Sequence, residues 1–387
     1  MNIVLGCSAW QRGLNLGHLD GIGVYSRELA TALLAKQVHI EGVVFGRQQP
    51  LLRDAQENQS ENAAPQIPFP SFTSGRRVSI EALLALLAGK DFVLPRELTR
   101  PFDLIHAPDH IIPKQKKIPV VATVMDLIPL LHPEWVGGRL LAAKNWVFAR
   151  SIQSADHIVT ISEFSKQSLM AHLHIPEERI TVTPLGVTHV ADCRSDFSAE
   201  NFVAGLGLAP GFFLVLGTLQ PRKNLERIIA AHQRLPREAR KEHPLIVVGR
   251  NGWGMDHLLP SLDALAQKGE GKWLRFLPDE GVKALLATAQ ALVFPSLYEG
   301  FGLPVIEAFA AGCPVITSNT TSLPEVAGDC AWLVNPGDEE DIAAAMIAAI
   351  ANPVQRRQFI DKGRLRAKAF TWEACADKTL EAYAKVL

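Results

Sequence analysis

Short hydrophobic runs alternate with longer helix-like segments along the whole chain. The runs are rich in Val, Ile, Leu and Phe, as buried strands are. They predict strands at Ile3–Cys7, Ile40–Phe45, Leu104–His106, Val120–Val124, His157–Ile161 and Ile180–Thr183, then at Phe213–Leu216, Leu245–Val248, Leu274–Phe276, Ala291–Phe294, Pro314–Thr317 and Ala331–Val334. The segments between them predict helices, among them Tyr25–Lys36, Leu140–Ser154, Leu225–Gln233, Val282–Ala289 and Val305–Ala311. This alternation is typical of doubly wound α/β proteins, whose parallel sheets carry helices on both faces.

The predicted strands fall into two series, separated by a polar stretch with little periodicity. We place the boundary in this region, near residues 190–205. The chain is expected to form two Rossmann-like domains, residues 1–195 and 196–370, with a last helix at 371–387 returning to the N-terminal domain. Residues 48–74 predict a long surface loop. Two such sheets face a central cleft, and ligands in these folds bind outside the carboxyl ends of the strands.

Charge and composition limit the classes of function that the protein can have. The 387 residues carry 39 Lys and Arg against 40 Asp and Glu, a net charge of −1. Phosphate neutralisation along a nucleic acid needs a clear excess of cations, so a dedicated nucleic-acid binder is disfavoured. An anionic ligand must instead be held by a few well-placed cations. Hydrophobic residues make up 48% of the chain, which excludes a disordered protein.

The spacing of the cysteines and the lack of membrane signals in the sequence bear on the compartment in which the protein is expected to work. The five cysteines are widely spaced and form no C-x-x-C pair, which fits reduced thiols better than disulfides or a zinc site. The N-terminus has no basic region or cleavage signal, and no apolar run reaches the ~18 residues of a spanning helix. We expect a cytoplasmic protein, with contact at the inner face of the membrane left open.

The most informative stretch joins two carboxylates through a glycine-bearing turn. Glu299 follows a predicted strand, and Glu307 lies in the first turn of the next helix, where Pro304 favours the first helical position. Gly300 and Gly302 allow backbone N–H groups to approach a ligand closely. The start of the helix adds a partial positive charge that suits a phosphate.

Two carboxylates beside an anion site make sense if they accept hydrogen bonds from hydroxyl groups. One would bind the hydroxyls of a sugar and the other those of a ribose, with a diphosphate between them. The alternative is a surface carboxylate and a helix-terminal Glu that supports the dipole.

This stretch resembles the E-x7-E signature of retaining nucleotide-sugar glycosyltransferases of the GT-B fold, specifically glycosyltransferase family 4. Further segments extend the resemblance over both halves of the chain in the right order: Gly21–Tyr25, Gly217–Leu225, Asn319–Val326 with Gly328, and Phe370–Trp372 with Tyr383. The G-T-x-x-P-R-K-N form and the run Asp126–Glu134 are most similar to bacterial mannosyltransferases that build surface polysaccharides.

The resemblance implies that the C-terminal domain holds the donor and the N-terminal domain the acceptor. It implies that Glu307 binds the ribose and Glu299 the transferred sugar, and that the backbone of the turn contributes. The residues implied on the donor side are Glu307, Gly300, Phe301, Gly302, Leu303, Thr218, Gly21 and Gly23. A same-face mechanism that retains the anomeric configuration, in which the leaving phosphate helps to deprotonate the acceptor, is implied as well.

Arg222 and Lys223 are the cations expected to neutralise the departing diphosphate. The sequence contains no D-x-D metal motif, so a metal-independent reaction that needs no cofactor is expected. The alternative is a solvated helix start. Cations are unfavourable at a helix N-terminus, however, so their presence there implies a countercharge.

The glycine-rich segment Gln11–Gly23 is predicted to be a loop over a diphosphate or a transferred sugar, or else a hairpin with no ligand. No G-x-x-x-x-G-K-[ST] sequence occurs, which disfavours a P-loop NTPase, and a nicotinamide oxidoreductase is disfavoured because the G-x-G-x-x-G fingerprint is absent.

On the acceptor side we place His106, Asp109, Met125 and Ser162, with Asp126 as the nearest polar catalytic candidate. His106 and Asp109 are expected to line the cleft, because Pro108 and a loop position argue against an H-x-x-x-H metal pair. Met125 stands where the family has His, which puts the rate or the sugar preference in doubt. Ser162 fits a helix cap as well as an acceptor contact.

The preferred donor is GDP-mannose and the acceptor is a glycan or a lipid-linked glycan. A UDP-sugar, GDP-rhamnose and a catalytically silent nucleotide- or glycan-binding protein stay open as alternatives, and the oligomeric state is left open. A basic cluster beside Trp146 and Phe148 suggests either an anionic membrane surface or simple solvation; it comprises Lys114, Lys116, Lys117, Arg139, Lys144 and Arg150.

Overall fold

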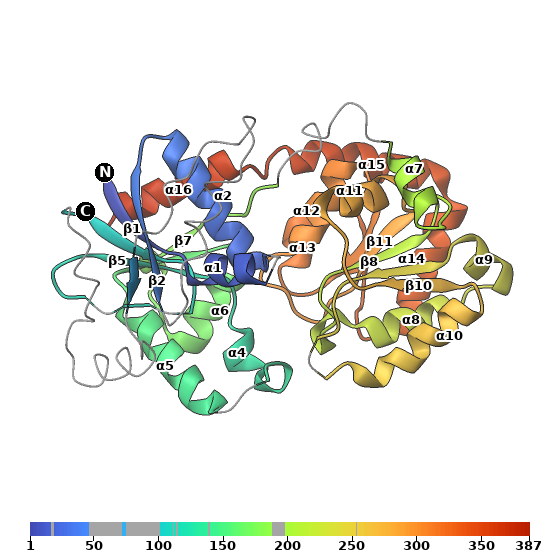
Figure 1. Cartoon of the computed structure of the whole chain (residues 1–387), viewed down its shortest axis with the longest axis horizontal. Coiled ribbons are helices and arrows are strands. Elements are labelled where there is room, and N and C mark those ends of the chain that lie inside the picture. The colour runs from blue at the N-terminus through green and yellow to red at the C-terminus, as the bar shows by residue number, and fades with distance from the viewer. Residues whose placement is uncertain are drawn as a thin grey trace. The chain divides into compact units, whose positions relative to one another are not determined.

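The computed structural model describes residues 1–16, 19–45, 72–74, 101–110, 112–113, 115–137, 140–187, 198–252 and 254–387. The chain divides into two compact units, each built on its own parallel sheet (Figure 1). Unit 1 comprises Met1–Leu131, Gly138–Gly186 and Trp372–Leu387, and unit 2 comprises His132–Gly137 and Val187–Thr371.

Unit 1 contains a seven-stranded sheet in the order β3-β2-β1-β4-β5-β6-β7. Its strands are β1 (Asn2–Gly6), β2 (His39–Phe45), β3 (Phe72–Ser74), β4 (Leu104–Ala107), β5 (Val120–Val124), β6 (His157–Thr160) and β7 (Ile180–Val182). Its helices are α1 (Ser8–Asn15), α2 (Gly21–Ala35), α4 (Ile128–Leu131), α5 (Leu141–Ser154), α6 (Glu163–Leu173) and α16 (Trp372–Ala384).

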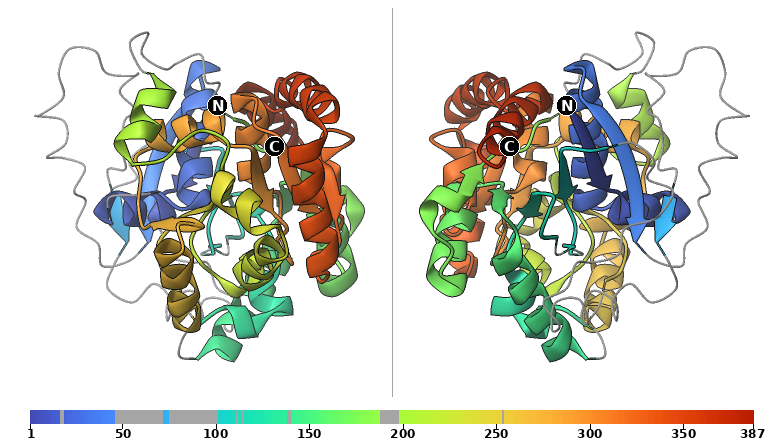
Figure 2. Two further views of the ribbon diagram at one scale, coloured as in Figure 1. Left: turned by 90° about the vertical axis from the view of Figure 1, so that its right-hand side faces the viewer. Right: turned by 90° about the vertical axis from the view of Figure 1, so that its left-hand side faces the viewer.

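Unit 2 contains a six-stranded sheet in the order β10-β9-β8-β11-β12-β13. Its strands are β8 (Phe213–Leu216), β9 (Leu245–Val248), β10 (Gly271–Leu274), β11 (Ala291–Phe294), β12 (Val315–Ser318) and β13 (Trp332–Val334). Its helices are α7 (Ala199–Gly205), α8 (Leu225–Gln233), α9 (Arg237–Glu242), α10 (Leu259–Gln267), α11 (Asp279–Thr288), α12 (Leu303–Ala311), α13 (Leu323–Ala327), α14 (Glu339–Ala351) and α15 (Pro353–Ala367). Helices flank the strands of the sheets (Figure 2).

The sheets form because their strands are apolar on both faces. Every residue of β5, β8 and β11 is buried, as a parallel strand covered by helices requires. All strand pairs between the named strands are parallel, so the carboxyl ends of the strands in each sheet lie at one edge. The two doubly wound parallel sheets confirm the predicted fold class.

Three sequence expectations need correction. Gln11–Gly23 was expected to be a loop, but residues up to Asn15 belong to helix α1 and Gly21 begins α2, capped by the Asp20 carboxylate, which accepts from Gly23 N at 2.8 Å. The third strand of the second series is shifted to Gly271–Leu274 by its register with β9, which leaves Phe276 beyond the strand. Within the predicted loop 48–74, Phe72–Ser74 forms β3, and the other residues lie outside the described ones.

Helix α16 packs within unit 1 (Figure 1). The Trp372 ring lies 6.3 Å from that of Tyr25 on α2, and Lys36 Nζ lies 2.6 Å from an Asp377 carboxylate oxygen. At the other end of unit 2's chain, Val187 N donates to the backbone oxygen of Phe370 at 3.0 Å. Two of the places where the chain passes between the units, after Gly186 and after Thr371, are therefore joined by a backbone hydrogen bond within unit 2.

Among the described residues, the cysteines are unpaired and buried, at positions 7, 313, 330 and 375. No helix within the described ranges is long and apolar enough to cross a membrane.

Candidate functional site

The sheet of unit 2 brings two sequence motifs together at the carboxyl ends of adjacent strands. β8 and β11 pair in parallel, so the segments that follow them leave the sheet side by side. After β8 the chain forms a short 3-10 turn, Pro221–Lys223, before α8 begins. After β11 it forms the segment 295–302, which leads into α12. Leu297 N donates to the backbone oxygen of Arg222 at 2.8 Å, which joins the two segments.

Arg222, Lys223 and Glu299 form a charged triad at this junction. Arg222 Nη1 lies 2.7 Å from Glu299 Oε2, and Lys223 Nζ lies 2.7 Å from Glu299 Oε1. Lys223 Nζ also lies 4.3 Å from the centre of the Phe294 ring, close enough for a cation–π contact. The countercharge expected for the two cations is therefore Glu299.

The electrostatics of the triad favour an anion. Burial alone would raise the pKa of Glu299, but the charges of Arg222 and Lys223 outweigh it and lower the pKa to about 2. Glu299 is thus ionised at neutral pH, and the triad keeps one net positive charge. A partly desolvated positive group with backbone donors nearby is suited to a diphosphate.

Glu307 lies on α12, and its environment differs from that of Glu299. Burial raises the pKa of Glu307 to about 7, the charge of Asp279 adds to the rise, and Lys283 and Lys223 oppose it. Asp279 and Lys283 come from α11, which packs against α12. A carboxylate that titrates near neutrality binds ribose hydroxyls best when it is ionised.

The backbone is closely packed around the triad. Gly217 has φ +119°, and a Cβ at Gly249 would lie 1.9 Å from the backbone oxygen of Gly217, so only glycine allows the loops after β8 and β9 to touch. Thr218 lies within this contact. Gly302 has φ +104° and precedes α12, which begins at Leu303, so Pro304 is the second residue of the helix and not, as predicted, the first.

Sequence reasoning missed several residues that build this site. Asn224, the last residue of the P-R-K-N motif, adopts φ +62° and donates from Nδ2 to the backbone oxygens of Pro295 and Pro336, at 3.0 and 2.7 Å. Asp279, Lys283 and Ser322 were also missed. Ser322 lies in the predicted S-x-P-E-V motif, so the signal was present without a role attached to it.

An aromatic surface lies beyond β9 and β10. Phe276 is 56% exposed, and the guanidinium of Arg250 lies 5.6 Å from the centre of its ring. These side chains come from segments that follow adjacent strands. An exposed ring beside a cation offers a flat face to a planar ligand group.

In unit 1, His106 does not have the environment expected of an acceptor contact. Its ring is completely buried, Nδ1 lies 2.6 Å from the Tyr383 hydroxyl, and Nε2 lies 2.6 Å from Thr123 Oγ1. Thr123 Oγ1 in turn lies 2.9 Å from the Tyr25 hydroxyl. The prediction that His106 lines a cleft is wrong for this structure, because both ring nitrogens are engaged inside the unit. Burial lowers its pKa to about 3, so the ring is neutral.

The other predicted acceptor-side residues lie near the carboxyl ends of β4, β5 and β6. Asp109 is buried, and Met125 and Asp126 are partly buried just after β5. Asp126 Oδ1 accepts from Ile128 N at 2.9 Å at the start of α4. Ser162 caps α6 by accepting from Ser165 N at 3.0 Å, which confirms its role as a helix cap.

Two further predictions concern the glycines at the start of α2 and the basic cluster. Gly21 and Gly23 lie in the first turn of α2, and their contact with a donor stays a prediction. In the basic cluster, Trp146 is exposed with the Arg150 guanidinium 6.0 Å from its ring, whereas Phe148 belongs to the core. Lys114 and Arg139 lie outside the described residues.

Within the described part of the chain, no group of three or more His, Cys, Asp or Glu side chains is arranged to hold a metal ion.

Comparison with known proteins covers both halves of the chain. Residues 19–190 match the family described as Glycosyltransferase Family 4, and residues 197–366 match Glycosyl transferases group 1. The chain is 32% identical to O-antigen chain mannosyltransferase B of Escherichia coli, over 94% of this chain and 96% of that protein. It is 28% identical to the MMP alpha-(1->4)-mannosyltransferase of Mycolicibacterium hassiacum, over 74% of this chain and 66% of that protein.

Solved structures share the fold. Anabaena HepE in complex with UDP and glucose matches with a TM-score of 0.73 at 17% identity, over the full length of both chains. WaaG, a glycosyltransferase involved in lipopolysaccharide biosynthesis, matches with a TM-score of 0.67 at 16% identity, over 98% of each chain. The fold is thus GT-B, and from the sequence match over nearly the whole length of its relative, the chain belongs to glycosyltransferase family 4.

Proposed function

We propose that the protein transfers a hexose from a nucleotide sugar to a glycan or lipid-linked glycan acceptor, with retention of configuration, and that the preferred donor is GDP-mannose. The observation that carries the proposal is the triad of Arg222, Lys223 and Glu299, which keeps a net positive charge beside the start of α12. The mannosyltransferase relatives support the choice of sugar, and the UDP in HepE supports a nucleotide donor.

The triad suits the departure of a nucleoside diphosphate. Negative charge grows on the diphosphate as the bond to the anomeric carbon breaks. Arg222 and Lys223 are already fixed by Glu299, so they stabilise this charge with little reorganisation. These cations and the backbone N–H groups at Gly300–Leu303 supply the positive charge that other transferases take from a metal, and we propose that transfer proceeds without one.

Glu299 has a second task in this proposal. Its oxygens are held 2.7 Å from two cations, and a carboxylate oxygen accepts more than one hydrogen bond. The carboxylate therefore still accepts hydrogen bonds from the hydroxyls of the transferred sugar. The acceptor hydroxyl attacks the anomeric carbon from the side of the leaving group and passes its proton to the departing phosphate oxygen. No protein nucleophile is needed for this step.

A screen of GDP-, UDP- and ADP-sugars by thermal shift, followed by a transfer assay in EDTA with a mannose-terminated glycan acceptor, tests this function. We expect GDP-mannose to raise the Tm most and to be consumed only when acceptor is present. If transfer is faster with a UDP-sugar or with GDP-rhamnose than with GDP-mannose, that sugar nucleotide is the preferred donor instead. Tight nucleotide binding without turnover would favour a silent binding protein, the alternative that Met125 suggests.

Nucleoside diphosphate binding is expected to weaken roughly tenfold between pH 8 and pH 6. With a pKa of about 7, the ionised fraction of Glu307 falls by about this factor over the interval, and the ribose hydroxyls lose a charged acceptor. Isothermal titration with GDP and UDP at fixed ionic strength measures the effect. Because the terminal phosphate also titrates near pH 6, the Glu307→Gln variant provides the reference curve.

The stability of Glu307→Gln gives an independent check. The folded protein binds the Glu307 proton more tightly than the unfolded chain, so this group stabilises the fold fully below pH 4.5. The contribution is lost as the pH rises to about 7. At pH 8 the ligand-free Gln variant should therefore have a higher Tm than the wild type, and GDP binding by this variant should lose the Glu307 component of the pH dependence. If the pH dependence of GDP binding is the same in Glu307→Gln as in the wild type, Glu307 does not bind the ribose.

A further inference from the structure

The segment 294–301 is held by side chains at almost every carbonyl group. Buried or partly buried donors reach its backbone oxygens from three directions. Thr317 donates to Phe294 O at 3.0 Å, Asn224 to Pro295 O at 3.0 Å, Ser318 to Ser296 O at 2.5 Å, Arg222 to Tyr298 O at 3.3 Å, and Ser322 to Glu299 O at 2.9 Å and to Phe301 O at 3.1 Å. A turn with its carbonyls engaged in this way has few alternative conformations.

Ser322 has a special place among these donors. Its hydroxyl is completely buried and bridges the backbone oxygens of Glu299 and Phe301, the residues on either side of Gly300. The other donors each engage carbonyls farther upstream. Ser322 therefore determines the conformation of the turn at the point where the Glu299 side chain leaves the backbone and the path to α12 begins.

Helix α13 follows Ser322 directly and packs against the same turn. A Cβ at Gly302 would lie 2.6 Å from Leu323 Cδ2, so the backbone at Gly302 touches the first residue of α13. At the other end of α13, Arg366 donates from Nε to Val326 O and from Nη2 to Glu325 O, both at 2.5 Å. Both ends of this short helix are thus fixed.

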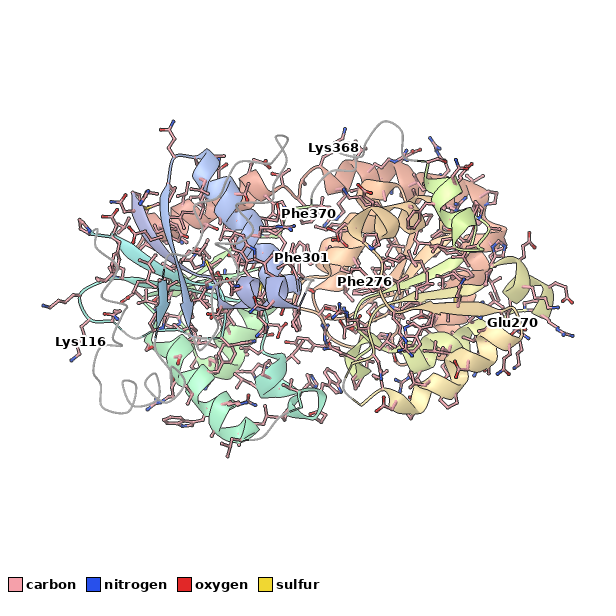
Figure 3. The ribbon with its side chains drawn as sticks, in the orientation of Figure 1. Lys116, Glu270, Phe276, Phe301, Lys368 and Phe370 are labelled. Atoms are coloured by element: carbon pink, nitrogen blue, oxygen red, sulfur yellow. The ribbon has the colours of Figure 1, made fainter. Side chains whose placement is uncertain are left out.

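Contacts of Arg366 and Phe370 link the far end of α13 back to the turn that holds Glu299. The Arg366 guanidinium lies 5.6 Å from the centre of the Phe370 ring, and the Phe370 ring meets that of Phe301 edge to face at 5.6 Å. Phe301 and Phe370 are labelled in Figure 3. Phe301 belongs to the turn that Ser322 holds. The path from Ser322 through α13, Arg366 and Phe370 therefore leads to Phe301, whose backbone oxygen accepts from Ser322, and all of these residues lie within unit 2.

We propose that Ser322 is a positioning residue of the transfer reaction, which fixes the carboxylate of Glu299 for the hydroxyls of the transferred sugar. The inference rests on the proposed function, because it assigns the Glu299 turn to the sugar rather than to the nucleotide. Arg222 and Lys223, the charged part of the diphosphate site, come from a different segment, so nucleotide affinity depends less on Ser322 than the position of the Glu299 carboxylate does. Preorganisation of this kind matters because a displacement of about 1 Å can cost on the order of 10²-fold in rate.

The test compares Ser322→Ala with Ser318→Ala. Both variants remove a buried hydroxyl that donates to a carbonyl of the same segment, so both should lower the Tm to a similar extent. We expect Ser322→Ala to lower kcat for transfer on the order of 10²-fold, while its affinity for GDP changes by less than about threefold. Ser318→Ala should keep both quantities within about threefold of the wild type.

The outcomes separate this proposal from the proposed function. Equal kcat values for the two variants, or a parallel loss of GDP affinity and kcat in Ser322→Ala, would overturn the positioning role. A wild-type protein that transfers no sugar from any tested donor would overturn the proposed function, and this proposal with it. If Ser322→Ala does not fold, Arg366→Ala should show the same split between kcat and GDP affinity, with the exposed Arg357→Ala as its control; no split there overturns the proposal.

Discussion

Replacing Lys223 with Met is expected to lower the rate of sugar transfer by about 10² to 10³-fold and to weaken GDP or UDP binding at least tenfold, about 1.4 kcal/mol. Met is an unbranched side chain, so the substitution removes the charge and its cation–π contact with Phe294 while leaving a flexible apolar side chain in its place. Arg222 remains 2.7 Å from Glu299, and the buried carboxylate keeps one partner. Steady-state kinetics with the preferred donor, together with calorimetric titration of the nucleoside diphosphate, measure both effects.

The control for Lys223→Met is Lys241→Ala, an exposed cation of the same unit on α9. It should leave the rate and the affinity unchanged, whereas Lys223→Arg should recover part of both because it restores a charge with a different shape. Wild-type kinetics in Lys223→Met would show that the triad is a structural ion pair with no part in the reaction.

The second large effect is expected for Glu299→Gln, with opposite signs for binding and for transfer. Glu299 competes with the diphosphate for Arg222 and Lys223, and its pKa of about 2 shows how strongly they hold it. Removing its charge raises the net charge of the site from one to two positive charges. Binding of GDP or UDP should therefore become about three- to tenfold tighter. Transfer should fall at least about 10²-fold, because the sugar hydroxyls lose their charged acceptor.

The opposite signs distinguish Glu299 from a residue that merely maintains the fold. A Glu299→Gln protein that had lost its local structure would bind the nucleotide more weakly and transfer more slowly, which is the pattern expected of Lys223→Met. Glu242→Gln, an exposed carboxyl change in the same unit, should alter neither quantity. A weaker GDP affinity in Glu299→Gln would contradict the competition between carboxylate and diphosphate.

Much of the fold could be predicted because its strands are local and apolar. A buried parallel strand is hydrophobic on both faces, so β5, β8 and β11 stand out from the polar segments around them. Helix α1 was missed for the opposite reason. Its glycine at position 13 lowers helix propensity, and a helix that packs against α2 forms through that contact, which the local pattern does not reveal.

The motifs identified the charged residues of the candidate site, whose roles stay predictions, but not the contacts between them. Spacing and chemistry identified Arg222, Lys223, Glu299 and Glu307, since each lies in a motif that follows a strand. The pairing of Glu299 with both cations depends on β8 and β11 being neighbours, which is a property of the sheet order. Ser322 lies in a motif that was recognised, but its role was missed because it donates to the carbonyls of Glu299 and Phe301, which are distant from it in sequence.

The buried chain of hydroxyl groups around His106 also restricts how protons move during transfer. An imidazole with a pKa of about 3 stays neutral throughout the range in which the enzyme would be assayed. Its two nitrogens are committed to Tyr383 and Thr123, so it neither collects a proton from an acceptor hydroxyl nor returns one to a leaving group. His106, which lies within β4, therefore takes no part in acid–base chemistry, which agrees with the proposal that the acceptor's proton passes to the departing phosphate.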